Sequence, residues 1–293
     1  MYILGIDENG LGLTNQAMLG PLVVSSVGFK IQKERFSLEI PFEFKERIRV
    51  YDSKELFKRT KKSYRLLEDT ALSFLSILKG SVIDNFDLRI FKEFNIEKVP
   101  CNLEGFCFFQ KPFNLPLWTE KNYLDRELKD FLNQKGIRFI YFRFILLCPK
   151  LLYNKDKYKE EAFSFAKIIL DWQRTINSRR YKVLCGNIKN YSKKTVENWW
   201  KEKSFFLDSE KIEFVTRGDK EEFVMGLASI LGKYIREIFI ERINRYFSFC
   251  DKSVPYCSGY RHNKKFDIFI KRAKFICKKN NLDFVCLARD YNM

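Results

Sequence analysis

Three carboxylates are the residues of this chain whose types and spacing could do chemistry. Asp7 and Glu8 follow the apolar segment Tyr2–Ile6, and Asp219 lies roughly two hundred residues later. Because Gly10 comes soon after the paired acids, we expect a strand over Tyr2–Ile6 to end there and the chain to turn. Two neighbouring carboxylates repel each other, and a hard cation such as Mg²⁺ or Mn²⁺ relieves the repulsion by taking oxygen ligands from both. Taken alone, paired acids are more commonly a solvated turn, so the surrounding motifs must decide.

Four short motifs occur in an order that is typical of one enzyme family. The first reads Gly-Ile-Asp-Glu-Asn-Gly-Leu-Gly over Gly5–Gly12 and continues at Gly20–Val24; the others are Asp52–Leu56, Gly218–Asp219 with Ala228–Glu237, and Ser258–Tyr260. Together they resemble the type 2 ribonucleases H, the ribonuclease HII family. Each motif is weak by itself, but four in the same order make a chance match improbable.

The resemblance implies a fold, an activity and a cofactor. Type 2 ribonucleases H have the α/β ribonuclease H-like fold, a five-stranded mixed sheet with helices on both faces. They are metal-dependent endoribonucleases that hydrolyse the RNA strand of RNA–DNA hybrids. By resemblance, Asp7, Glu8 and Asp219 would be the catalytic residues and the ligands of Mg²⁺ or Mn²⁺. Carboxylates that hold two such ions can activate water with one ion and stabilise the leaving oxygen with the other.

The resemblance also implies a nucleic-acid partner, either an RNA–DNA hybrid or DNA with embedded ribonucleotides. The residues it places in contact with nucleic acid are Gly10, Leu11, Gly12, Lys54, Lys233 and Tyr260. The chain has 54 Lys and Arg against 37 Asp and Glu, a formal net charge of +17, which attracts a polyanion at long range. The alternative is a lysine-rich chain whose excess charge is spread over solvated faces.

Two departures from the family pattern bear on catalysis. The family has a third metal-binding Asp at the end of a central strand, and the best match here, Tyr181–Asn187, has Cys185 at that position. A thiol is a soft ligand and a poor partner for Mg²⁺, although Glu221 or Glu222 could compensate. Leu11 replaces the Arg of the family's Gly-Arg-Gly, which removes a charge-assisted phosphate contact. We therefore keep a second hypothesis, a catalytically degenerate nucleic-acid-binding protein of the same fold.

Segments with strand and helix patterns alternate along the chain, which favours an α/β sheet. We expect strands over Tyr2–Ile6, Leu22–Lys30, Gly136–Leu147 and Tyr181–Cys185, and helices over Lys58–Leu78, Tyr158–Ile176 and after Asp219. We expect one ribonuclease H-like domain over residues 1–250, with 80–135 as an insertion. Residues 251–293 are expected to form a basic helical C-terminal extension.

Cysteine and histidine usage argues against several other classes of protein. Eight cysteines show no regular spacing and the only histidine is His262, so a zinc site and histidine-based catalysis are poorly supported. The sequence opens without a basic and apolar leader, and Arg143 interrupts the longest apolar run. We therefore expect no signal peptide and no transmembrane helix. Cysteines without a disulfide framework fit a reducing compartment, so we expect an intracellular, cytoplasmic protein.

Overall fold

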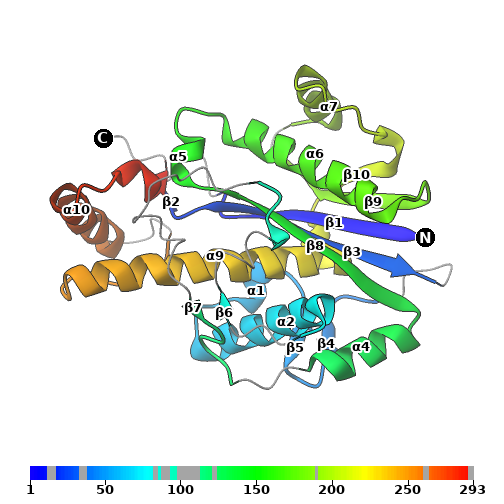
Figure 1. Ribbon diagram of the computed structural model, residues 1–293, viewed down its shortest axis with the longest axis horizontal. Helices are drawn as coiled ribbons and strands as arrows, with labels where there is room; N and C mark the ends of the chain where they lie inside the picture. The colour runs from blue at the N-terminus through cyan, green and yellow to red at the C-terminus, as the bar shows by residue number, and fades with distance from the viewer. Residues whose placement is uncertain are drawn as a thin grey trace.

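A five-stranded mixed sheet forms the centre of the computed structural model (Figure 1). The structure describes residues 1–11, 18–32, 38–81, 85–86, 93–97, 113–120, 124–188, 191–259 and 264–289. The strands of the central sheet lie in the order β10-β9-β1-β3-β8. Their bounds are β1 (Tyr2–Asn9), β3 (Leu22–Ile31), β8 (Ile137–Leu147), β9 (Tyr181–Gly186) and β10 (Ile212–Val215).

The strands of this sheet form an antiparallel and a parallel part. β3 pairs antiparallel with both β1 and β8, whereas β9 pairs parallel with both β1 and β10. The carboxyl ends of β1, β9 and β10 therefore meet at one edge of the sheet. In open α/β sheets, ligands bind in the crevice outside such carboxyl ends. The acids near the end of β1 lie at this edge.

Helices cover both faces of the sheet, as Figure 1 shows. One face carries α6 (Lys157–Ile176) and α7 (Lys193–Glu202), and the other carries α2 (Lys61–Lys79), α4 (Asp125–Gln134) and α9 (Phe223–Cys250). A buried apolar cluster fills each interface. The cluster under α6 includes Leu4 and Ile6 of β1, whereas the cluster under α9 includes Ile3. Each face of β1 is therefore packed against a different helical layer.

Shorter elements complete the described part of the chain. Pairs of short strands join β2 (Met18–Leu19) to β11 (Ala288–Arg289), β4 (Phe42–Phe44) to β5 (Ile48–Val50), and β6 (Asn85–Phe86) to β7 (Phe113–Asn114). Short or peripheral helices are α1 (Ser53–Leu56), α5 (Pro149–Leu152), α8 (Gly218–Glu221), α10 (Lys264–Lys279), η1 (Ser209–Lys211) and η2 (Phe284–Cys286). No helix of the described residues is long and apolar enough to cross a membrane.

α9 lies close to the sheet because small residues face the strands. A Cβ added to Gly232 of α9 would come 2.2 Å from Oγ of Ser25 in β3, and one added to Gly5 of β1 would come 2.6 Å from the backbone of Val224. Ser25 also donates a hydrogen bond to the carbonyl of Ala228 at 2.7 Å. Because a close-packed interior has no room for extra atoms, these contacts fix the position of α9 relative to β1.

The expected sheet, five-stranded and mixed with helices on both faces, is confirmed. One expected boundary is wrong, because β1 does not end at Ile6 but continues to Asn9. Its last residues keep their pairing with β3, so the ladder of hydrogen bonds extends the strand through the two acids. The helix expected from Lys58 begins at Lys61, because the side chain of Thr60 caps it. Elsewhere the strands and helices lie close to the expected ranges.

Two segments expected to lie outside the main fold are in part packed against it. Within 80–135, Leu128 and Leu132 of α4 are buried in the cluster under α9. Within 251–293, Phe266 and Ile270 of α10 are buried against the C-terminal half of α9, next to Phe247. The division into a domain, an insertion and a basic extension stays a prediction.

Candidate active site

Asp7 and Glu8 lie near the carboxyl end of β1 and belong to opposite faces of the sheet. Successive side chains of a strand alternate between the faces. Asp7 therefore shares its face with Ile3, under α9, and Glu8 shares its face with Ile6, under α6. We expected a turn that would bring both acids to one side, and the longer β1 corrects this. A ligand held by both carboxylates must lie at the edge of the sheet, where its two faces meet.

Three of the sequence motifs meet at Asp7. Ser229 of α9 forms a side-chain hydrogen bond to the Asp7 carboxylate. Oγ of Ser229 also lies 2.9 Å from Oγ of Ser53 in α1, a residue 176 positions away in the sequence. Asn9 donates from Nδ2 to the carbonyl of Ser229 at 3.0 Å. Motifs that are far apart in the chain are thus joined by hydrogen bonds around one carboxylate.

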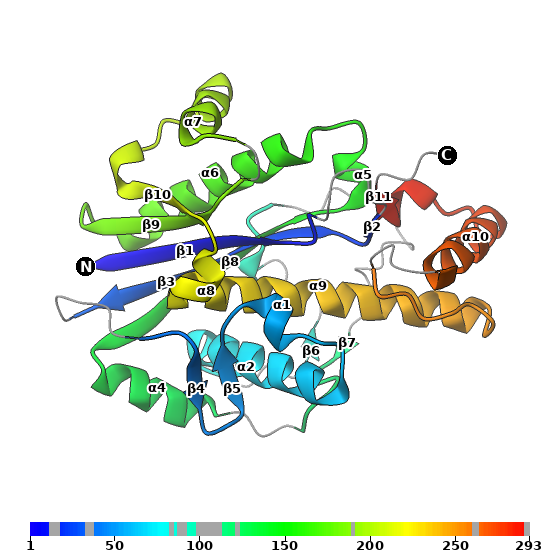
Figure 2. The ribbon, with the colours of Figure 1, turned by 180° about the vertical axis from the view of Figure 1, so that it is seen from behind.

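Asp219 reaches the same group of charges from α8, the short helix that precedes α9. Figure 2 shows α1 and α8 both lying against α9. Arg217, with a φ of 58°, occupies the N-cap of α8, so the Asp219 carboxylate is not used as a cap. Asp219 is half-buried, and its charge acts on both Asp7 and Glu8. The structure therefore brings the three predicted acids into one electrostatic group.

Burial and mutual repulsion raise the pKa values of these acids. Burial raises the pKa of Asp7, and the charges of Glu8 and Asp219 raise it further. Burial raises the pKa of Glu8 to about 7, although the ammonium group of Lys54 opposes the shift. Burial also raises the pKa of Asp219, with the charge of Asp52 adding to it. Ionising the group together is therefore costly unless a cation lies among the carboxylates.

Lys54 of α1 provides a cation beside this group. Burial lowers the pKa of Lys54, but the three acids and Asp52 together outweigh burial and raise it. Asp52 accepts a hydrogen bond from the backbone N–H of Lys54 at 2.7 Å, which caps α1, and pairs with Nζ of Lys220 at 3.0 Å. The cap and the ion pair hold α1 where its lysine faces the acids. Sequence analysis predicted a contact of Lys54 with nucleic acid, and the structure brings this residue to the site.

The neighbouring strand β9 has a glycine, and not a carboxylate, beside Asp7. Cys185 pairs with Ile6 in the parallel register of β9 and β1, so the next residue, Gly186, lies opposite Asp7. A Cβ added to Gly186 would come 3.0 Å from Oδ1 of Asp7. Cys185 is fully buried in the cluster under α6, and burial raises the pKa of its thiol. Gly186 is therefore the residue of β9 beside Asp7, and the expectation that Cys185 takes the third ligand position stays a prediction.

The acids suit a hard divalent cation in their chemistry. Asp7, Glu8 and Asp219 offer carboxylate oxygens, the ligands that Mg²⁺ and Mn²⁺ prefer. A cation among them would also relieve the repulsion that raises their pKa values. In the side-chain positions of the described residues, no three Asp, Glu, His or Cys side chains form a group that could hold a metal ion. Side-chain rotation at the sheet edge would have to bring the carboxylates onto one ion.

The turn after the acids is held by two buried arginines. Gly10 has a φ of 97°, and a Cβ added to it would come 2.4 Å from Nε of Arg236. The carbonyl of Gly10 accepts a hydrogen bond from Arg289 of β11, near the other end of the sequence. Arg289 is 4% exposed and Arg236 is fully buried. Gly10 is required here both for its positive φ and for the close approach of Arg236.

The structure places the other predicted nucleic-acid contacts as follows. Leu11 is buried among the apolar residues under α6, so its side chain belongs to the core. Lys233 is also buried, with Nζ 2.9 Å from Oε1 of Glu237. Gly12 and Tyr260 lie outside the described residues. Of these predicted residues, the structure brings Gly10 and Lys54 next to the acids.

Glu161 of α6 is a buried acid that none of the sequence motifs contains. This residue is 1% exposed, and its charge raises the pKa of Cys185 in β9, the strand that follows α6. It lies in helical phase with Phe165, Ile168 and Trp172, all of which are buried. A charged residue inside an apolar helical stripe is a signal that could have found it, because charged residues are almost never fully buried without a reason.

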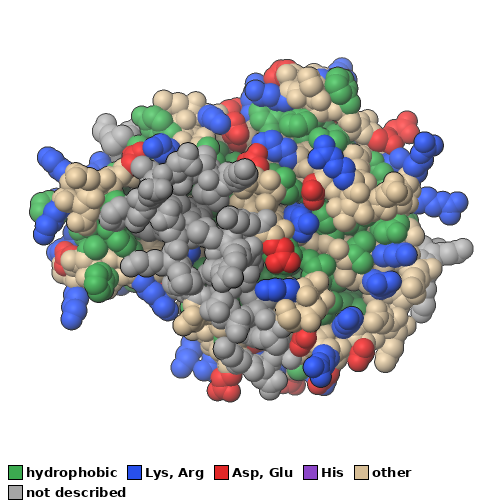
Figure 3. All heavy atoms as spheres, viewed as in Figure 1, with side chains coloured by type: hydrophobic (Ala, Val, Ile, Leu, Met, Phe, Trp, Pro, Cys, Tyr) green, Lys and Arg blue, Asp and Glu red, His purple; other side chains and the backbone are tan. Residues whose placement is uncertain are grey.

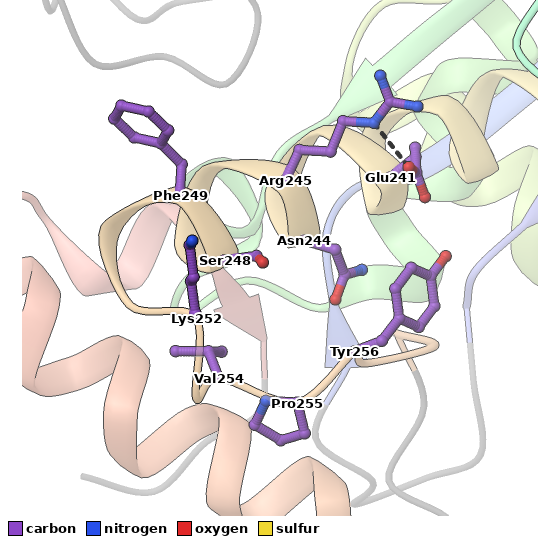
Figure 4. Close-up of a pocket in the computed structure, with 9 residues that line it drawn as sticks. All are labelled: Glu241, Asn244, Arg245, Ser248, Phe249, Lys252, Val254, Pro255 and Tyr256. Carbon is purple, nitrogen blue, oxygen red and sulfur yellow. Dashed lines mark hydrogen bonds and ion pairs between the residues drawn. The ribbon is translucent and has the colours of Figure 1, made fainter.

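A hollow of ≈ 600 Å³ lies away from the acids, at the C-terminal end of α9 (Figure 4). Its lining includes Glu241 and Arg245, which pair at 2.7 Å, and residues Val254, Pro255 and Tyr256 of the segment that follows α9. None of the predicted catalytic acids lines it. The candidate site is therefore the group of carboxylates and not this hollow.

On the face that Figure 3 shows, the Lys and Arg side chains of the described residues are spread over the surface and do not form one patch. Lys and Arg side chains lie there among acidic and apolar ones, over several elements. A distribution of this kind attracts a polyanion through the net charge of +17. It does not by itself mark the path of a bound strand on that face.

Solved structures of ribonucleases H are similar to this chain. A point mutant of Bst ribonuclease HIII has a TM-score of 0.48 and 9% identity, covering 98% of this chain and 65% of that chain. Bst ribonuclease HIII in complex with Mn²⁺ has a TM-score of 0.48 and 10% identity, covering 100% of this chain and 67% of that chain. The PCNA:ribonuclease HII complex from Archaeoglobus fulgidus gives a TM-score of 0.43 and 15% identity, covering 98% of this chain and 93% of that chain.

The chain spans 65% of the length of the first ribonuclease HIII. No protein-family model matches the chain, and no curated protein matches it. The sheet order and the helices on both faces make this a ribonuclease H-like fold, as the motifs led us to expect.

Proposed function

We propose that this protein is a metal-dependent endoribonuclease of the ribonuclease HII type, which hydrolyses the RNA strand of RNA–DNA hybrids. Its substrates in this proposal include DNA with embedded ribonucleotides. Asp7, Glu8 and Asp219 would hold Mg²⁺ or Mn²⁺. The bound ion would supply a Lewis acid that activates water and stabilises the leaving oxygen of the phosphodiester.

The observation that carries this proposal is the hydrogen-bonded group of Asp7, Ser229 and Ser53. An acid that is 9% exposed and lies beside two further acids lowers the stability of a fold. Proteins keep such groups where a ligand offsets the repulsion, which makes a set of acids with raised pKa values a candidate for function. The serines orient the Asp7 carboxylate at the carboxyl ends of the parallel strands, where ligands of α/β sheets bind.

The remaining residues of the site would bind and orient the nucleic acid. Lys54 lies beside the acids and would offset the charge of the phosphate that approaches them. The backbone of Gly10, Leu11 and Gly12 would contact the strand near the ribose, and Tyr260 would stack on a sugar or base. For Lys233 to take part, its ammonium would have to leave Glu237.

One observation favours the second hypothesis, a catalytically degenerate nucleic-acid-binding protein. Gly186 stands beside Asp7, where a further carboxylate would complete the acids on that face. With one ligand fewer, a metal binds less tightly and the chemical step slows. The net charge of +17 that attracts nucleic acid does not depend on this ligand.

Cleavage of defined substrates tests the proposal. We would incubate the protein with a DNA duplex that carries an RNA stretch and with one that carries a single ribonucleotide, each with Mg²⁺ or Mn²⁺. Asp7→Asn is the blank, and Asp130→Asn, an exposed acid of α4, is the matched control. Cleavage that Asp7→Asn abolishes and Asp130→Asn retains is the expected result. Tight, salt-sensitive binding without cleavage would favour the degenerate binder instead.

A further inference from the structure

Glu161 differs from the other buried carboxylates in the described part of the chain. Asp52 pairs with Lys220, Asp69 with Arg47, and Glu237 with Lys233. Glu68 accepts hydrogen bonds from three backbone N–H groups. By contrast, Oε2 of Glu161 is buried with neither a hydrogen bond nor an ion pair among the described residues, whereas Oε1 of Glu237, which also lacks a hydrogen bond, lies 2.9 Å from the ammonium of Lys233. A buried carboxylate without a donor costs several kcal/mol, so its presence needs an explanation.

The position of Glu161 in the fold supplies one. It lies in the first turns of α6, on the face of the sheet to which Glu8 and Cys185 belong. Glu8 and then Asp7 are the charges that act on it most strongly. Trp200 of α7 donates from Nε1 to the carbonyl of the next residue, Ala162, at 2.6 Å, which holds this turn of α6 in place. A second acid is thus fixed on the side of β1 where Glu8 lies.

We propose that Glu161 is a further ligand of the divalent cation, acting together with Glu8 on the α6 face of the sheet edge. It adds a carboxylate on the side of Glu8, whereas the position beside Asp7 on the other face, at Gly186, has none. This inference rests on the proposed function, because it assumes that Asp7, Glu8 and Asp219 hold a metal. It adds a ligand from α6 that none of the four sequence motifs contains.

Isothermal titration calorimetry with Mn²⁺, in the absence of nucleic acid, tests this inference directly because it measures the affinity of the protein for the metal. The variants are Glu161→Gln, which keeps the shape and removes the charge, and Glu160→Gln, as the matched control. Glu160 is the neighbouring acid of α6, 22% exposed and paired with Lys155. Asp7→Asn reports on the proposed site itself. Far-UV circular dichroism and the midpoint of thermal unfolding establish that each variant is folded.

We expect Glu161→Gln to weaken Mn²⁺ binding by about tenfold or more, since changes close to a metal commonly cost 10–100-fold in affinity. Glu160→Gln should bind as the wild type does. If Asp7→Asn weakens binding and Glu161→Gln does not, Glu161 is a core residue and only the further inference fails. If the wild type binds no Mn²⁺, or if Asp7→Asn binds it equally well, the proposed metal site fails and the inference fails with it.

Discussion

Two buried glutamates, on helices that cover opposite faces of the sheet, have opposite surroundings. Glu68 of α2 is fully buried and accepts from the backbone N–H groups of Leu117, Trp118 and Thr119 at 2.8, 2.6 and 2.9 Å. The hydroxyl of Tyr234 donates to it as well, at 2.9 Å. Glu161 of α6 is 1% exposed, and its Oε2 has no partner in the described part of the chain.

The difference separates a carboxylate that holds structure from one that is available to a ligand. Four donors fix Glu68, and through it the segment that carries Trp118 is docked onto α2. Nothing of this kind satisfies Glu161, and its strongest charged neighbour is another acid, Glu8. Burial alone therefore does not distinguish the two roles, but the number of donors does.

Removing the carboxylate of Glu68 should have the largest effect on stability. Glu68→Ala leaves three backbone N–H groups without an acceptor, and we expect a loss of about 3 kcal/mol or more, at roughly 1 kcal/mol for each. Urea unfolding followed by tryptophan fluorescence measures this loss. Glu202→Ala, at an exposed site of α7, is the control. A loss no greater than that of the control would remove the contrast between the two glutamates.

The corresponding change at Glu161 should act in the opposite direction. Without divalent metal at pH 8, we expect Glu161→Gln to raise the free energy of unfolding by about 1 to 2 kcal/mol, in the range by which replacing buried charge can stabilise a protein. The same urea experiment, with a chelator present, gives the value. Glu160→Gln should leave stability unchanged. A loss of stability in Glu161→Gln would mean that its carboxylate has a structural role after all.

A new carboxylate beside Asp7 should offset the loss of the one that Glu161 provides, because it adds a ligand from the other face of the sheet edge. In the Glu161→Gln background, we expect Gly186→Asp to restore about tenfold in Mn²⁺ affinity, or about 1.4 kcal/mol. Cys185→Asp should restore less, because Cys185 lies level with Ile6, one residue further from the sheet edge than Gly186. Titration calorimetry of the two double variants compares these positions. Restoration by Cys185→Asp alone would show that the register does not decide the ligand position.

The smallest expected effect is on the pH dependence of stability without metal. Burial raises the folded-state pKa values of both Glu68 and Glu161 above the ordinary value of 4.5. The folded protein therefore binds more protons than the unfolded one above pH 4.5, and its stability falls as the pH rises through the folded pKa. Because hydrogen-bond donors oppose the shift at Glu68, Glu161→Gln should flatten this dependence more than Glu68→Gln does. Measuring the free energy of unfolding of both variants between pH 4.5 and 8 checks this prediction. A flatter dependence in Glu68→Gln than in Glu161→Gln would contradict it.

The sequence alone was sufficient for the fold and for one side of the site. The motif residues Asp7, Ser53, Ser229 and Asp219 could be selected from four short segments, and the structure brings them together. Apolar periodicity also located α2 and α6 and the strands of the sheet. These features depend on local patterns, which a single sequence displays.

The rest of the site depended on partners that lie far away in the sequence. The length of β1 is set by its pairing with β3, so the separation of Asp7 and Glu8 onto two faces could not be read from Tyr2–Ile6. The register of β9 against β1 puts Gly186, and not Cys185, beside Asp7, and this pairing could not be read from Tyr181–Cys185 alone. Helical phase could have shown that Glu161 is buried. Whether hydrogen-bond donors surround its carboxylate depends on residues that only the folded structure brings near it.

The contact between Arg289 and Gly10 has a consequence for the order in which this protein is made. The two residues are 279 positions apart, and β11, which carries Arg289, pairs with β2 just after the turn at Gly10. On the ribosome, the strand with Asp7 and Glu8 emerges first, whereas the arginine that holds the following turn is added long afterwards. A growing chain therefore cannot complete this corner until nearly all of the described residues have been synthesised. We infer that the acids acquire their final surroundings only after Arg289 has been added to the chain.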